Sequence, residues 1–180
     1  MFSLRTVIVL LFIVFVVMPQ NMVSQERKGL TGVGIQIFTP PFYNNSPAAF
    51  LGSMEMQPDI LVSAWVANNI TIEPSIGVIS YKNFTYWRLG FAVVNHFGQE
   101  RLSPYVLFRA KTYLLSNGGI KIHDYLFGLA GGGEYFIAEK FSVSGEAQLN
   151  YLVPDKKFSL FEKRNTIMTG VGITVRFYLN

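Results

Sequence analysis

The stretch Phe141–Val153, FSVSGEAQLNYLV, decides the fold because its apolar and polar residues alternate. The odd-numbered positions are apolar or glycine, whereas the even-numbered positions from Ser142 to Asn150 are polar. A period of two residues is the pattern of a β-strand with one apolar and one polar face. At about 3.3 Å per residue the stretch is roughly 40 Å long, which is enough to cross a bilayer when tilted. It therefore predicts a membrane-crossing strand.

The same alternation recurs along the chain between clusters of turn residues. The last strand runs from Ile167 to Leu179, with Thr174 and Arg176 on its polar face. Six further strands are predicted at Leu30–Phe38, Asp59–Ala67, Ile70–Lys82, Tyr86–His96, Pro104–Leu115 and Asp124–Ile137. Eight is the smallest usual strand number for a barrel that spans a membrane. We therefore predict an all-β fold, an eight-stranded antiparallel up-and-down transmembrane β-barrel.

The connections between these strands differ in length at the two ends of the predicted barrel. Short connections are expected at residues 68–69, 97–103 and 138–140, and longer ones at residues 39–58, 116–123 and 154–165. The connection at residues 83–85 is a short exception on the long-loop side. Short turns at one rim and long loops at the other are typical of outer-membrane barrels.

Residues 1–24 are predicted to be a signal peptide, and residues 25–180 the barrel domain. Arg5 is the only charge ahead of the apolar run Val7–Met18, and Ser24 is a small residue at the expected cleavage site. The run is about 12 residues long, shorter than the roughly 20 that a spanning helix needs. An uncleaved N-terminal anchor is the alternative. No later segment is apolar for long enough to span as a helix, so a membrane location requires a barrel.

The composition excludes several classes of protein. Half of the residues are hydrophobic and 14% are charged, which is too apolar for a disordered chain. There is no cysteine, which excludes disulfides, thiolate metal sites and CxxC redox pairs. The formal net charge of +4 does not by itself indicate nucleic acid, and we expect no nucleic-acid partner for an exported barrel.

Seven charged residues fall on the polar faces of the predicted strands. They are Glu73, Arg88, Arg109, Lys111, Glu134, Glu146 and Arg176. Three acids and four bases inside one narrow barrel nearly neutralise each other, as buried charges must. An interior of eight strands is about filled by side chains, so a salt-bridged plug is the main interpretation. A narrow gated pore or a small ligand site lined by the same groups is the alternative.

Aromatic residues on the apolar faces are predicted to form two belts facing lipid. Trp87, Phe127 and Tyr151 lie toward the long-loop rim, and Tyr135, Phe141 and Phe177 lie toward the short-turn rim. Such belts are expected at the two water interfaces of a membrane.

Two internal similarities bear on the register of the strands. The sequence WVANNITI from Trp65 matches FIAEKFSV from Phe136 in the order of aromatic, apolar, alanine, two polar residues and resumed alternation. We therefore expect two hairpins of the short-turn rim to be built alike. The triplets Gly32–Gly34 and Gly170–Gly172 are expected to lie near each other where the barrel closes.

From Leu30 to Asn180 the sequence resembles the small outer-membrane β-barrel domains of OmpA/OmpW-like and OmpX-like bacterial proteins. The residues that carry the resemblance are WVANNITIEPS from Trp65, GLAGGGEYFI from Gly128 to Ile137, and the final strand. The stretch Gly170–Phe177 resembles the C-terminal signal read by the outer-membrane insertion machinery, although Tyr178, Leu179 and Asn180 follow it. The resemblance implies a bacterial outer-membrane location, with assembly by that machinery.

The sequence contains no recognisable catalytic, phosphate-binding or metal-binding motif, and no enzyme activity, metal or cofactor is predicted. No Lys-Ser/Thr pair follows Gly131–Gly133, so it is not a phosphate-binding loop. His96 and His123 are the only histidines and have no third ligand in a recognisable spacing. Ser103 near His96 is the closest approach to a nucleophile with a base.

Basic residues gather on the long-loop side. Lys121, Lys156, Lys157, Lys163 and Arg164 are candidates for contact with the phosphates of lipopolysaccharide or with a partner surface, and a solvated face is the alternative. The loop at residues 39–58 is apolar enough to fold over the mouth or to form an adhesive patch. The predicted function is a structural or surface-interaction role in the outer membrane, with outer-membrane lipid and lipopolysaccharide as partners. An OmpW-like channel for small or hydrophobic solutes and a soluble secreted ligand-binding calyx are the alternatives.

Overall fold

The computed structural model describes residues 27–38, 58–81, 84–98, 101–117, 119–157 and 164–179. The predicted signal peptide, Lys163 and nearly all of the loop at residues 39–58 lie outside these ranges. Within them, the structure contains no helix long and apolar enough to cross a membrane.

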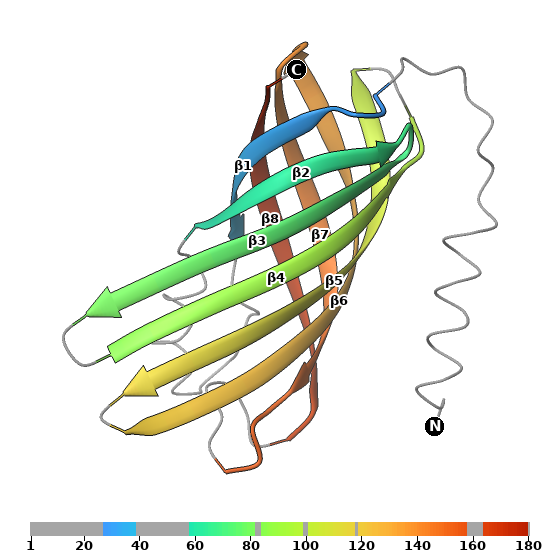
Figure 1. The fold of residues 1–180 in the computed structure, drawn as a ribbon. Coiled ribbons are helices and arrows are strands. Elements are labelled where there is room, and N and C mark those ends of the chain that lie inside the picture. The colour runs from blue at the N-terminus through green and yellow to red at the C-terminus, as the bar shows by residue number, and fades with distance from the viewer. Residues whose placement is uncertain are drawn as a thin grey trace.

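Eight antiparallel strands close into a barrel in which each strand pairs with its neighbours in sequence and β1 pairs with β8 (Figure 1). The strands are β1 Thr31–Phe38, β2 Asp59–Ala67, β3 Ile70–Tyr81, β4 Phe84–His96, β5 Leu102–Asn117, β6 Ile120–Ala138, β7 Phe141–Val153 and β8 Thr166–Tyr178. The eight-stranded up-and-down barrel predicted from the sequence is therefore confirmed. The pairing of β1 with β8 closes the sheet, so that both of its edges are paired along the body of the barrel.

The strands of one side are much longer than those of the other. β1 and β2 have 8 and 9 residues, whereas β5 and β6 have 16 and 19. The pairing of β2 with β3 ends at Ile60 and Ile76, and the pairing of β6 with β7 begins at Tyr125 and Val153. Beyond these rungs β3–β6 continue alone as a four-stranded sheet, visible at the lower left of Figure 1. We call this part the protruding sheet.

The prediction of a long loop at residues 116–123 is wrong. β5 continues to Asn117 and β6 begins at Ile120, so the connection is a tight turn in which Gly119 has φ of +93°. Glycine takes this left-handed conformation without steric penalty. The inward-facing Leu115 and Ile122 keep the alternation going up to the turn. Only the connections at residues 39–58 and 154–165 remain long at this rim.

The expectation that the two glycine triplets lie together is also wrong. β1 and β8 do close the barrel, but Gly32 pairs with Tyr178 and Gly34 with Arg176, while Gly172 pairs with Phe38. A β-carbon at Gly32 would lie 2.8 Å from Cδ1 of Tyr178. The β1 glycines therefore make room for large inward side chains of β8 rather than for other glycines.

The internal repeat does mark two similar hairpins at the short-turn rim. Each strand has a register shift just before its two-residue turn, between Trp65 and Ala67 in β2 and between Phe136 and Ala138 in β6. A β-bulge of this kind bends the strand and redirects a side chain. Both Trp65 and Phe136 lie on the inward faces of their strands.

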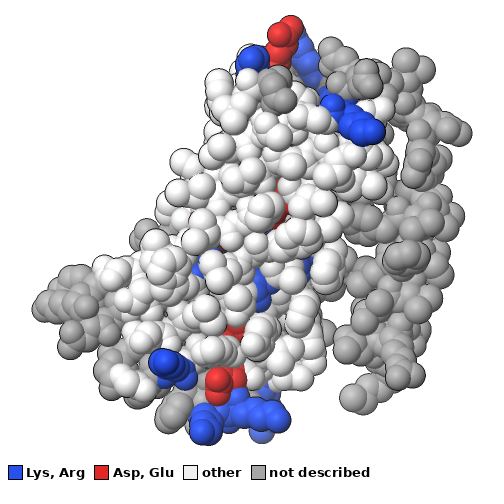
Figure 2. Space-filling view, in the orientation of Figure 1, with Lys and Arg blue, Asp and Glu red and all other residues white. Residues whose placement is uncertain are grey.

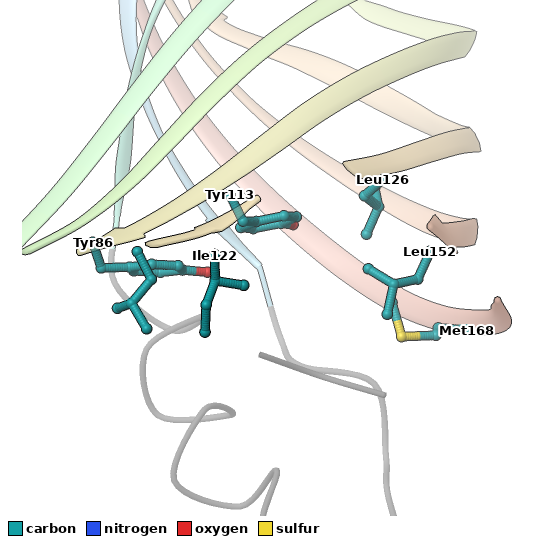
Figure 3. Packing of buried hydrophobic residues seen from close by; sticks show 7 residues of the cluster. Tyr86, Tyr113, Ile122, Leu126, Leu152 and Met168 are labelled. Carbon is teal, nitrogen blue, oxygen red and sulfur yellow. The ribbon is translucent and has the colours of Figure 1, made fainter. Parts of the chain in front are cut away.

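An apolar cluster fills the inside of the barrel at the long-loop end (Figure 3). Its members are Tyr86, Tyr113, Leu115, Ile122, Leu126, Leu152 and Met168, with Ile79 packed against them. The rings of Tyr86 and Tyr113 stack, with 6.1 Å between their centroids. We call this group the mouth cluster. It separates the charged interior described next from the long-loop rim.

Candidate functional site

The alternation of the strands brings all seven predicted charged residues into the barrel, where each is at most 6% exposed. They come from six strands, β3–β8, and an eighth residue, Asp59, joins them from β2. The charged side chains fall into three clusters that follow one another along the barrel.

The cluster nearest the mouth is centred on Asp59. Its Oδ1 accepts a hydrogen bond from Nε of Arg88 at 2.7 Å, and its Oδ2 accepts one from Nζ of Lys111 at 2.6 Å. Nη2 of Arg88 also donates to the carbonyl of Pro58 at 3.3 Å. One carboxylate thus binds two cations from β4 and β5.

Two glycines leave the space that this cluster occupies. A β-carbon at Gly77 would overlap the Asp59 carboxylate and the Arg88 guanidinium. A β-carbon at Gly90 would overlap the Ser75 hydroxyl and lie 3.2 Å from Cγ of Lys111. At both positions a larger residue would have to displace these side chains, so the glycines are explained by close approach and not by the backbone conformation.

The middle cluster is centred on Glu146. Oε1 of Glu146 accepts hydrogen bonds from Nη1 of Arg109 at 2.8 Å and from Nε2 of Gln148 at 2.7 Å. Tyr105 donates its hydroxyl to Oε2 at 3.2 Å, and Gln36 reaches Oε1 at 3.4 Å. The carboxylate is therefore held by one cation and three neutral donors.

The cluster nearest the short-turn rim is centred on Arg176. Its Nε and Nη2 donate to the two oxygens of Glu73 at 2.9 and 3.0 Å, which is a bidentate pair. Its Nη1 donates to Ser144 at 2.8 Å and lies 3.5 Å from Oε1 of Glu134. Glu134 in turn accepts hydrogen bonds from Ser142 and Tyr178. One arginine here links two carboxylates.

Asp59 and Asp124 are the buried charged residues of the described strands that were not named from the sequence. Asp59 has the same parity as the inward Leu61 and Trp65 of β2, and Asp124 the same parity as the inward Glu134 of β6. Alternation therefore contained the signal for both. Asp124 is fully buried, and its Oδ1 accepts the backbone N–H of Asp155 at 2.7 Å.

The structure brings Ser103 and His96 together, but not in the geometry of a catalytic relay. Ser103 Oγ lies 3.2 Å from Nδ1 of His96, and Oε2 of Glu134 lies 3.9 Å from the same nitrogen. A relay needs the hydroxyl and the carboxylate on opposite ring nitrogens. Here Nε2 is 3.2 Å from Thr71, and Ser103 is fully buried. His123 is exposed, and the part of the chain that the structure describes contains no group of three metal-binding side chains.

The predicted aromatic belts lie on the outside of the barrel. Five of the six side chains are between 37% and 53% exposed, and Phe141 is half-buried. Phe127 pairs with Tyr151 near the long-loop rim, and Phe141 pairs with Phe177 near the short-turn rim. Of the predicted phosphate-binding residues, four are exposed at the long-loop rim: Lys121, Lys156, Lys157 and Arg164.

On the face that Figure 2 shows, most of the blue and red surface lies at the two ends of the barrel. Between the two ends the described surface in this view is mostly white, with small areas of blue and red. Outward positions on the described strands carry no Asp, Glu or Arg, and Lys121, near the tip of β6, is the single Lys among them. The outer wall between the rims is therefore uncharged.

No family model matches the sequence, and no curated protein matches it. Among solved structures, the barrel is similar to the N-terminal β-barrel domain of Pseudomonas aeruginosa OprF, with 14% identity, a TM-score of 0.49, and coverage of 85% of this chain and 100% of that chain. It is similar to Neisserial surface protein A (NspA), with 16% identity, a TM-score of 0.48, and coverage of 82% and 95%. A designed transmembrane β-barrel matches with 12% identity, a TM-score of 0.46, and coverage of 87% and 100%.

The closed ladder of eight strands, with charged groups inside and an uncharged wall outside, defines the fold independently of these similarities. The chain has the eight-stranded antiparallel up-and-down architecture of small transmembrane β-barrels.

Proposed function

We propose that the chain is an outer-membrane barrel with a structural or surface-interaction role and no catalytic activity. The observation that carries the proposal is the uncharged outer wall around a charged interior. A Lys or Arg facing lipid at the bilayer midplane costs about 2 to 4 kcal/mol, whereas water would impose no such exclusion. An exported barrel of this kind belongs in the outer membrane, with its short turns toward the periplasm.

Membrane extraction tests the location. We expect the protein in the membrane fraction after a high-pH wash, soluble only in detergent, and migrating faster on gels before heating than after. Recovery from the soluble periplasmic fraction would instead support the secreted calyx. A calyx needs a continuous apolar interior, but the three charged clusters lie behind the mouth cluster. The second apolar cluster, of Val94, Tyr105, Leu107 and Ala130, lies beside the Glu146 cluster, to which Tyr105 donates a hydrogen bond.

The interior supports a closed barrel rather than a channel. The charged side chains of the three clusters are at most 6% exposed, and each cluster is held by ion pairs of 2.6 to 2.9 Å. The mouth cluster adds an apolar layer beyond them. We expect a silent planar bilayer. A steady conductance that changes in Arg109→Ala or Glu134→Ala would establish the OmpW-like channel in its place.

The exposed basic residues at the long-loop rim support a contact with lipopolysaccharide phosphates. Ammonium and guanidinium groups bind phosphate well, and this rim faces the outer leaflet in the proposed orientation. The test is flotation with vesicles containing lipid A, using the triple variant Lys156→Gln, Lys157→Gln, Arg164→Gln. The matched control carries Lys28→Gln, Arg101→Gln and Lys140→Gln, exposed basic residues of the opposite rim.

We expect the long-loop triple variant to lose most of the preference for lipid A over neutral vesicles, and the control to keep it. Equal loss in both variants would show that net charge alone sets the preference. No loss in either would identify this basic face as a solvated one.

A further inference from the structure

Arg27 is a buried cation at the short-turn end that belongs to no strand. Its side chain is 5% exposed although it precedes β1. The backbone of residues 27–30 is fixed against β2, because Gly29 N–H donates to the carbonyl of Trp65 at 2.8 Å and Trp65 N–H donates to the carbonyl of Leu30 at 2.9 Å. Gly29 has φ of +89°, which allows the chain to turn back there. The segment thus directs Arg27 toward the base of the barrel.

Two aromatic rings from the internal repeat receive the guanidinium group. Cζ of Arg27 lies 4.3 Å from the ring centroid of Phe136 and 5.2 Å from that of Trp65. Phe136 and Trp65 occupy equivalent positions of the repeat, each just before a β-bulge. A barrel requires neither the repeat nor its aromatic residues, but a cation site at the base requires both rings.

A buried carboxylate and further rings complete the site. Glu134 is 1% exposed and attracts Arg27, although burial has the larger effect and lowers the pKa of Arg27. Tyr178 stacks on Phe136 with 5.7 Å between centroids, and His96 stacks on Trp65 with 4.3 Å. Aromatic faces near a carboxylate suit a planar, weakly hydrated cation, which describes guanidinium better than ammonium.

We propose that the base of the barrel is a guanidinium-binding site that the chain fills with its own Arg27, so that the N-terminal segment locks the short-turn end. The site is specific for the planar cation and not only for positive charge. It follows that removal of the Arg27 side chain leaves a site that binds a free guanidinium compound. This inference is independent of the proposed surface role, because it concerns the opposite end of the barrel.

Trp65 provides a direct readout of the site. The chain has two tryptophans, so Trp87→Phe leaves Trp65 as the only one. In that background we compare the parent with Arg27→Gly, reconstituted in neutral vesicles, and titrate each with methylguanidinium chloride. Sodium chloride and tetramethylammonium chloride at matched concentration control for ionic strength and for charge without planarity.

We expect Arg27→Gly to shift the emission of Trp65, and methylguanidinium to restore the parent spectrum saturably while the other two salts do not. The parent should not respond to low concentrations of any of the three. Lys28→Gly, which removes the exposed neighbouring charge, should behave like the parent. Adding Phe136→Leu to Arg27→Gly should abolish the response to methylguanidinium.

Two results would overturn the proposal: an unchanged Trp65 emission in Arg27→Gly, or equal restoration by all three salts. Restoration by tetramethylammonium as effective as that by methylguanidinium would contradict the specificity for a planar cation. If Arg27→Gly fails to fold, the proposal is tested by refolding this variant from urea in the presence of each salt. The yield of folded protein is measured from its heat-modifiable band on gels. Methylguanidinium should raise that yield and sodium chloride should not, and equal yields would contradict the site.

Discussion

The barrel wall and the protruding sheet are built from the same strands with opposite polarity. In the wall, Leu89 and Phe91 of β4 face outward, whereas Arg88 faces inward. Beyond the rungs where β2 and β7 end, the inward positions become apolar. The outward positions of β3–β6 change from the apolar Val78, Trp87 and Leu114 to polar residues at the strand tips. These polar residues are Ser80, Thr85, Ser116, Lys121 and His123. The polarity of the outer face inverts within single strands, between Trp87 and Thr85 in β4 and between Leu114 and Ser116 in β5.

The difference shows where each part of the molecule meets its solvent. A wall with apolar residues outside and ions inside suits lipid, whereas a sheet with polar residues outside and an apolar inner face suits water. The wall of the barrel thus has the residue pattern of a membrane protein, whereas the tips of the protruding sheet have the pattern of a soluble calyx. The Asp59 cluster marks the boundary on the inside.

The largest expected effect comes from breaking an ion pair of the wall. Arg176→Met leaves Glu73 and Glu134 buried without their shared cation, which should lower the free energy of unfolding by about 3 to 5 kcal/mol. Urea unfolding of the protein in lipid vesicles, followed by the heat-modifiable band, measures the change. Arg164→Met, an exposed basic residue of the rim, is the control and should change stability by less than about 0.5 kcal/mol. Equal effects would mean that the interior pairs are not desolvated.

The mouth cluster should respond as a core does. Leu152 is fully buried there, so Leu152→Ala should cost about 2 to 5 kcal/mol in the same unfolding measurement. Leu149→Ala, on the lipid-facing side of the same strand and 51% exposed, is the matched control and should cost less. If the two substitutions cost the same, the mouth cluster is not a packed core.

An arginine on the outer surface should distinguish the wall from the protruding sheet. Ile173 is 58% exposed on the wall of β8, and Ile173→Arg should cost about 2 to 4 kcal/mol in vesicles. Ser116→Arg, on the outer face of the protruding sheet, should cost about 0 to 1 kcal/mol. A cost at Ser116 as large as that at Ile173 would place the protruding sheet in lipid.

The smallest contrast concerns two glycines. Gly77→Ala inserts a methyl group into the Asp59–Arg88 pair and should cost about 1 to 3 kcal/mol. Gly145→Ala places its methyl group on the outer wall, where no atom lies within 4 Å, and should stay within about 0.5 kcal/mol of the parent. A neutral Gly77→Ala would mean that the pair moves aside without loss.

The sequence was sufficient for the fold because alternation specifies both the strand and the face. Asp59–Ala67 and Phe141–Val153 were predicted with their exact bounds. The tips of β5 and β6 were missed because the outward residues Ser116, Lys121 and His123 are polar, and polar residues at these positions resemble a loop when the apolar wall is the expected pattern. In fact the polarity had inverted while the strand continued.

Which charged residues pair with each other inside the barrel could not be predicted from the sequence. The pair of Asp59 with Lys111 joins residues 52 positions apart on strands β2 and β5, which are not neighbours. Such contacts across the interior depend on the stagger of all eight strands, which alternation does not encode. For the same reason the role of Arg27, which lies outside every strand, could not be inferred from periodicity.

Single-cysteine spin labelling in lipid vesicles tests the opposed polarity of wall and protruding sheet most directly. The chain has no cysteine, so each substitution gives one label. Labels at Phe91→Cys and Ile173→Cys should be accessible to oxygen and shielded from a water-soluble nickel complex, whereas labels at Ser80→Cys and Ser116→Cys should show the reverse. Nickel accessibility at Phe91 and Ile173 equal to that at the two serines would contradict the account.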